Sequence, residues 1–286
     1  MSATADVENI LLLVLAALVP AVVYLTWVRT TERGQREGLS VVLGGFAYGA
    51  LFATIVAGAI EAILVAGGTS ISHAVPGPEF TFLNGNTTAG ALFLVLVIAP
   101  FVEEGFKALG VVNYRRALRT IADGPVVGAS VGLGFGFFET FLYGVAAYLT
   151  GGLVAGLALI VVRSLSSVLL HGSSTAFFGY GYAEAEVTQR GHAGASHYFG
   201  AVGLHSGFNA VVSLGTFAMV LGYSTSIADA LNLVGVGLGI LLAFSAIEYV
   251  RRLIVQASYP GALAAHPRFR PPSVRAAAGG RTPPRP

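Results

Sequence analysis

Three ionisable side chains follow one strongly apolar segment and are the residues best suited to chemistry. The run from Leu92 to Val102 is apolar, and Glu103, Glu104 and Lys107, the only lysine of the chain, come directly after it. The i,i+4 and i,i+3 spacings allow Lys107 to pair with either glutamate on one helix face. The lysine can neutralise one carboxylate and leave the other free as a base or a metal ligand. A purely structural ion pair that orients the helix is the alternative.

A fourth carboxylate, Glu139, lies in a later apolar segment. It follows Phe135 at i,i+4, and its segment carries Gly128, Gly132 and Gly136, a spacing that lets another helix pack closely. Glu139 has no nearby base in its own helix. It therefore needs a partner from elsewhere, a metal or a proton, and a protonated structural glutamate is the alternative.

Two further segments supply imidazoles. Arg163 and His171 are eight residues apart and lie on similar faces of one predicted helix, where Arg163 suits a counter-ion for a glutamate. His205 and Asn209 are at i,i+4, which suits two metal ligands, or one ligand and one oxyanion donor. Hydrogen bonds between packed helices are the alternative for both motifs.

Composition indicates the elements that must position these residues. The chain has 286 residues, of which 55% are hydrophobic and 10% charged, and its mean hydropathy is +0.75. These values predict an all-α polytopic membrane bundle, since soluble domains carry roughly 25% charged residues. The chain has no cysteine, which excludes disulfides and thiolate metal sites. The pI near 9.0 suits contact with lipid headgroups better than with nucleic acid.

About seven membrane spans are predicted from apolar segments of roughly 20 residues. They cover approximately residues 8–28, 40–66, 90–112, 125–148, 152–178, 197–221 and 229–250. Glu61, near the outer end of the second span, stands alone and is interpreted as an interface residue outside the site.

Basic residues gather in alternate loops, which predicts the orientation. They are Arg29, Arg33, Arg36, Arg115, Arg116, Arg119, Arg190, Arg251 and Arg252. The positive-inside rule makes these loops cytoplasmic, with the N-terminus outside and the C-terminus inside. We expect a membrane-embedded domain over residues 1–258 and a disordered basic tail over 259–286.

Depth in the membrane groups the polar residues. Counted along their spans, Glu103, Glu104 and the two histidines lie at or on the cytoplasmic side of the midpoint, as does Asn209, and Glu139 lies near the midpoint. Carboxylates and imidazoles converging in one intramembrane cavity suit a zinc ion with an open position for water.

The ordered motifs resemble the PrsW family of intramembrane proteases, which is related to the CAAX prenyl proteases. They are Glu103-Glu104-x-x-Lys107, Phe135-x-x-x-Glu139, the segment with Arg163 and His171, and His205-x-x-x-Asn209. The resemblance implies a prokaryotic cell-membrane peptidase that depends on a metal and cleaves membrane-anchored anti-sigma factors. The loop after the first span departs from the family pattern, because Glu37 is followed by glycine and not by proline.

The resemblance also implies roles for individual residues. The catalytic residues would be Glu103, Glu104, His171, His205 and Asn209; the metal ligands Glu104, Glu139, His171 and His205; and the supporting residues Lys107 and Arg163. Either glutamate of the pair could act as the base while His205 and Asn209 stabilise the oxyanion, or the same residues could bind the metal directly.

Two other functions fit an intramembrane set of charges. An ion- or proton-coupled transporter uses such residues, although the chain shows no internal repeat of the kind many transporters have. A non-catalytic membrane scaffold of the same fold is the second alternative. The substrate, the side from which it enters, and the oligomeric state are left open by the sequence.

Overall fold

The computed structural model describes residues 3–33, 36–74, 82–188 and 192–259. These residues form helices joined by short turns, and none of them forms a β-strand. Two parts of the sequence predictions lie outside the described residues: Arg190, and the predicted tail after Tyr259. The elements are α1 (Ala3–Thr31), α2 (Leu39–Ala47), η1 (Tyr48–Ala53), α3 (Thr54–Ala74), α4 (Thr88–Phe93), η3 (Leu94–Ile98), α5 (Ala99–Asn113), η4 (Arg115–Ala117), α6 (Asp123–Leu165), α7 (Ser167–Thr188), α8 (His192–Val212), α9 (Leu214–Val220) and α10 (Thr225–Ala257).

Five stretches of the described residues are long and apolar enough to cross a membrane. They are Asp6–Thr31, Leu39–Ala74, Thr88–Asn113, Asp123–Thr188 and Thr225–Ala257. The prediction of an all-helical membrane bundle is therefore confirmed. The count of seven spans and the orientation stay predictions.

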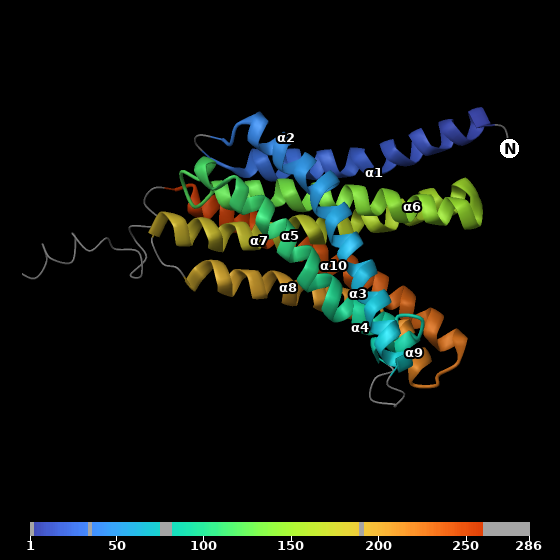
Figure 1. Cartoon of the computed structure of the whole chain (residues 1–286). Coiled ribbons are helices and arrows are strands. Elements are labelled where there is room, and N and C mark those ends of the chain that lie inside the picture. The colour runs from blue at the N-terminus through green and yellow to red at the C-terminus, as the bar shows by residue number, and fades with distance from the viewer. Residues whose placement is uncertain (1–2, 34–35, 75–81, 189–191, 260–286) are drawn as a thin grey trace, which may run out of the picture.

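The long stretch from Asp123 to Thr188 contains the predicted fourth and fifth spans. The chain reverses at Gly152, whose φ of 78° lies in the left-handed region that favours glycine. Residues before and after this point pack on each other, because Tyr148 and Ile160 share one apolar cluster. Figure 1 shows α6 doubling back on itself close to the N-terminal end of α1.

Two of the membrane-crossing helices contain a π-helical segment. The segment η1 joins α2 to α3, and η3 joins α4 to α5. Such segments are rare and are often found at functional sites. The second one, Leu94–Ile98, ends one turn before the paired glutamates and borders the site described below.

The C-terminal ends of α1 and α10 lie together at the end of the bundle opposite the N-terminus (Figure 1), and Arg119 lies 3.8 Å from Glu37 at the same end. Arg251 donates to the Thr31 hydroxyl at 2.9 Å, and the backbone N–H of Arg33 donates to Ser258. Toward the other end, α1 and α6 diverge from α3, α4 and α9 (Figure 1). The basic loops therefore share one end, as the orientation prediction requires.

Glycines let α6 and α7 approach closely enough for backbone contact. A β-carbon added at Gly128 would overlap the carbonyl of Thr175, and one added at Gly132 would overlap the carbonyl of His171. The small-residue stripe seen in the sequence is thus the contact surface for α7. It sets how near His171 comes to α6.

Carboxylates are also buried at the basic end, where Glu32 and Glu37 lie between two membrane-crossing stretches and Asp123 begins another. Glu32, Glu37 and Asp123 are each at most 2% exposed. Glu32 accepts a hydrogen bond from the backbone N–H of Glu37 at 2.9 Å, whereas its Oε1 has no partner among the described residues. Burial, together with the neighbouring carboxylates of Asp123 and Glu37, raises the pKa of Glu32 to about 8.

The raised pKa of Glu32 predicts a pH dependence of stability. The folded state keeps the proton while the unfolded chain loses it near its ordinary pKa of 4.5. The stability that this proton contributes is therefore complete below about pH 4.5 and is lost as the pH rises through about 8. Glu32→Gln should flatten the pH dependence of the melting temperature in detergent over this window and should stabilise the protein at its upper end. Glu248→Gln, at a half-exposed carboxylate of α10, is the control; equal slopes in both variants would contradict the prediction.

The contact between α6 and α7 predicts a second outcome. Gly132→Ala should destabilise the protein by about 1–3 kcal/mol, because the methyl group must push α7 away. Gly203→Ala in α8 is the matched control, since its β-carbon would enter open space. Thermal melts of the two variants in the same detergent test this. Similar melting temperatures would show that the helices can separate freely.

Candidate metal centre and catalytic cavity

Four helices bring the predicted site residues together in the middle of the bundle. They are Glu103, Glu104 and Lys107 from α5, Glu139 and Arg163 from the two limbs of α6, His171 from α7, and His205 and Asn209 from α8.

Lys107 pairs mainly with the second of the two adjacent glutamates. Its Nζ lies 2.8 Å from Glu104 Oε1 and 3.5 Å from Glu103 Oε2. The lysine side chain is 0% exposed and also lies over the ring of Phe135, 4.3 Å from the centroid. Helical spacing allowed Lys107 to pair with either glutamate. The distances show that it pairs closely with Glu104 and only loosely with Glu103.

Glu104 is engaged on both oxygens. Its Oε1 also accepts from the Ser174 hydroxyl at 2.9 Å and meets His205 Nδ1 at 3.0 Å, and its Oε2 accepts from Thr175 at 3.4 Å. A carboxylate with this many donors is well stabilised as an anion and has little capacity left for a substrate. Glu104 therefore fixes the positions of its neighbours.

His171 lies between two charged groups. Its Nδ1 is 2.9 Å from Lys107 Nζ, and its Nε2 is 2.8 Å from Glu139 Oε2. An ammonium group only donates, so Nδ1 accepts, and the ring proton sits on Nε2 and is donated to Glu139. By the same reasoning, His205 donates its Nδ1 proton to Glu104 and leaves a lone pair on Nε2.

Glu139 finds the partner that the sequence required. Arg163 Nη2 lies 2.6 Å from Glu139 Oε2 and also donates to Ser167 at 2.9 Å. The guanidinium stacks on the ring of Tyr143 at 4.1 Å. Arg163 thus serves as the counter-ion that holds Glu139 against His171.

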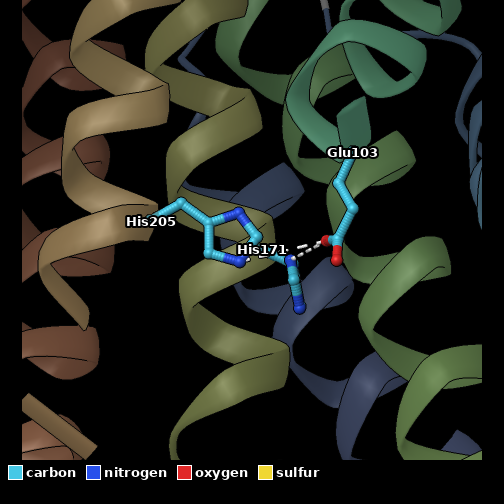
Figure 2. A group of neighbouring side chains, drawn as sticks. All are labelled: Glu103, His171 and His205. Carbon is cyan, nitrogen blue, oxygen red and sulfur yellow. Dashed lines mark ion pairs between the residues drawn. The ribbon is translucent and has the colours of Figure 1, made fainter. Parts of the chain in front are cut away.

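Glu103, His171 and His205 form a group that could hold a metal ion (Figure 2). Glu103 Oε2 lies 3.8 Å from His171 Nδ1 and 3.9 Å from His205 Nε2. In Figure 2 the carboxylate and the two rings, which stand at 88° to each other, converge from three helices. All three residues are buried.

The chemistry of this group fits a divalent ion. Its separations are somewhat longer than the roughly 3.4 Å edge of a tetrahedral site with bonds of about 2.1 Å. The far nitrogen of each histidine meets a carboxylate, Glu139 for His171 and Glu104 for His205. Carboxylate–histidine pairs of this kind orient metal ligands in proteins. The group contains Glu103, whereas the predicted ligands Glu104 and Glu139 contact the histidines from outside it.

A cavity of about 240 Å³ lies against the group. Its polar wall includes Glu103, Glu139, Arg163, His171 and His205, while Glu104 and Lys107 are not part of its lining. A larger groove of about 530 Å³, lined by Phe178, Tyr182 and Tyr198 among others, contains none of the predicted site residues. The smaller cavity is therefore the candidate catalytic cavity.

Asn209 lines the cavity and is also tied to the π-helical segment. Its Nδ2 donates to the Val95 carbonyl at 2.7 Å. An amide nitrogen carries two hydrogens, so one N–H remains for a ligand. The predicted donor role is compatible with this contact.

Two ionisable residues that line the cavity, Glu61 and Tyr143, were not among the site residues predicted from the sequence. Tyr143 follows Glu139 at i,i+4, and this spacing in the sequence could have indicated that the two side chains share one helix face. Glu61 has no polar neighbour at helical spacing, and only its location in an apolar segment pointed to it.

Comparison with known families finds one match. Residues 37–229, which is more than half of the chain, match the family described as PrsW family intramembrane metalloprotease. The matched region includes Glu37 and every predicted site residue. No curated protein and no solved structure matches the chain.

The geometry predicts which carboxylate binds the metal. Glu103→Ala, His171→Ala and His205→Ala should each abolish stoichiometric zinc binding, because each removes one of three ligands. Glu104→Gln should weaken binding by about 10–100-fold, since it acts through His205. Equilibrium dialysis with metal analysis measures both effects.

His73→Ala, which removes an exposed imidazole on α3, is the control for that experiment. Full zinc occupancy in Glu103→Ala, with complete loss in Glu104→Gln and Glu139→Gln, would contradict the assignment and support the ligand set predicted from sequence.

Proposed function

The chain belongs to the PrsW family of intramembrane metalloproteases, and we propose that it cleaves a membrane-anchored protein with water activated at Glu103, His171 and His205. The observation that carries this mechanism is the convergence of one carboxylate and two oriented imidazoles on a buried cavity. A divalent ion, when bound, supplies a water of lowered pKa and polarises the carbonyl of the peptide bond.

Glu103 has two proposed roles: its Oε2 would bind the metal together with the two histidines, and its second oxygen would accept the proton of the water. Its ion-pair contacts, to Lys107, His171 and His205, are all 3.5 Å or longer, so its carboxylate is held less tightly than that of Glu104. Glu104 is held by its donors and serves to orient His205 and Lys107. The different contacts of the two glutamates support this division of roles.

Asn209 and the Glu139–Arg163 pair complete the proposed site. The remaining N–H of Asn209 is available to stabilise negative charge on the carbonyl oxygen during attack. Glu139, fixed by Arg163, keeps the His171 proton on Nε2 and its Nδ1 lone pair toward the group.

Zinc is the proposed metal. Imidazole and carboxylate ligands suit zinc, and three protein ligands leave a fourth position for water, as in catalytic zinc sites. The three residues of the group supply that number.

We further propose seven spans with the N-terminus outside and the C-terminus in the cytoplasm of a prokaryotic cell. The shared location of the basic loops supports this orientation (Figure 1). The reversal at Gly152 splits the stretch from Asp123 to Thr188 into two antiparallel limbs, which supports the higher count. An anti-sigma factor anchored in the same membrane is the proposed substrate, on the basis of the family resemblance.

Loss of the activating residues should abolish cleavage. Glu103→Gln should lower kcat/KM by about 10²–10⁴-fold, the usual effect of removing a general base, and His205→Ala should have at least that effect. Removal of the metal with a chelator should stop cleavage, and zinc should restore it. The assay follows cleavage of a single-span peptide in proteoliposomes by mass spectrometry.

Glu8→Gln, at an exposed carboxylate of α1, should cleave like the wild type and controls for loss of charge alone. Both site variants must insert and melt like the wild type for the comparison to count. Wild-type rates in well-folded Glu103→Gln and His205→Ala would rule out the proposed mechanism.

A further inference from the structure

Glu61 of α3 faces the catalytic cavity but belongs to neither ion pair of the site. It lines the cavity together with Glu103 and Glu139. Its Oε1 is buried and has no hydrogen-bond partner among the described residues. The proposed mechanism does not use this carboxylate.

The other three carboxylates of the site each have a cation. Glu103 and Glu104 share Lys107, and Glu139 has Arg163. Glu61 has no such ion pair among the described residues. A buried polar atom without a partner is costly and calls for a donor that arrives with a ligand.

The metal group does not supply that partner. Among the described residues, the possible ligands are Glu103, His171 and His205, and Glu61 is not one of them. The unpartnered oxygen of Glu61 is therefore available to a hydrogen-bond donor of a ligand that enters the cavity.

A membrane-spanning substrate brings one kind of donor in quantity, its backbone N–H groups. In a helix these groups bond to carbonyls of the same helix, but a peptide bond must leave the helix before its carbonyl can be attacked. Each N–H freed in this way needs a new acceptor inside the protein, because the lipid around the substrate helix supplies none. A carboxylate oxygen with no other partner is a strong acceptor for it.

We propose that Glu61 accepts a hydrogen bond from a backbone N–H of the substrate beside the scissile peptide bond. Glu61 acts from α3, while Asn209 acts from α8, so the two contact the unwound segment from different helices. Glu61 is thus a substrate-positioning residue that holds the extended conformation in the cavity. This inference rests on the proposed function of the site.

An ester scan of the substrate tests the proposed hydrogen bond. The probe is a synthetic single-span peptide whose cleaved bond has been mapped by mass spectrometry. In a series of analogues, one backbone N–H near that bond is replaced at a time by an ester oxygen. Wild-type protein, Glu61→Gln and Glu61→Leu are compared in proteoliposomes by kcat/KM.

With the parent peptide, Glu61→Leu should lower kcat/KM by about 10–100-fold, because a buried N–H of the substrate is left without an acceptor. Glu61→Gln should lose less, because it keeps an oxygen acceptor. One ester position should impair the wild type by a similar factor and should have no further effect in Glu61→Leu. This lack of additivity identifies the two partners of one interaction.

Glu8→Leu, which removes an exposed carboxylate elsewhere, is the matched control and should match the wild type. Zinc stoichiometry should be unchanged in both Glu61 variants. If Glu61→Leu does not fold, Glu61→Gln carries the comparison with the same ester series.

The inference is overturned if the Glu61 variants cleave the parent peptide like the wild type, or if every ester effect adds fully to theirs. Its failure is distinct from failure of the proposed function. If only the Glu61 inference fails, Glu103→Gln and His205→Ala are still inactive. If the proposed function fails, these two variants remain active whatever the result for the Glu61 variants.

Discussion

The burial of Lys107 in an apolar bundle is the constraint on which the site depends. An ammonium group with no exposed surface is stable there only if anions and acceptors surround it. Glu104 supplies the closest carboxylate, at 2.8 Å, and His171 supplies an acceptor at 2.9 Å. Removing one partner of such a pair typically costs about 3–5 kcal/mol, because the remaining charge stays buried. The network therefore holds α5, α7 and α8 in one relative position.

The same network decides where protons sit on the histidines. Lys107 and Glu139 set the tautomer of His171, and Glu104 sets that of His205. The Nε2 lone pair of His205 is left free on the side of Glu103, whereas the Nδ1 lone pair of His171 accepts from Lys107 and lies 3.8 Å from Glu103 Oε2. A structural requirement, the satisfaction of buried charge, thereby produces the ligand geometry of a metal centre. The Nδ1 atom of His171 is the point of competition, since both Lys107 and a metal ion would use it.

The carboxylates of the site differ in how completely they are satisfied. Glu104 and Glu139 have short contacts to cations and histidines, and they act as supports. Glu103 has only long contacts and Glu61 has an oxygen with none, and both line the cavity. Incomplete satisfaction of buried groups is unusual in folded proteins, and here it coincides with the space where a substrate would lie. This difference separates the supporting residues from those available for chemistry.

The sequence by itself determined the membrane character, the helical class, the polar residues of the site and the family. These properties follow from local patterns: apolar length, helical spacing, and the type of residue placed in an apolar span. The reversal near Gly152 also agrees with the gap between the predicted spans 125–148 and 152–178. Only the tertiary structure decided that Lys107 holds Glu104, that Glu103 joins the two histidines, and that Glu61 faces the cavity. Spacings of three and four residues permit either glutamate equally well. Glu104 differs from Glu103 in its partners from other helices, Ser174 and Thr175 of α7 and His205 of α8, and no single segment encodes those contacts.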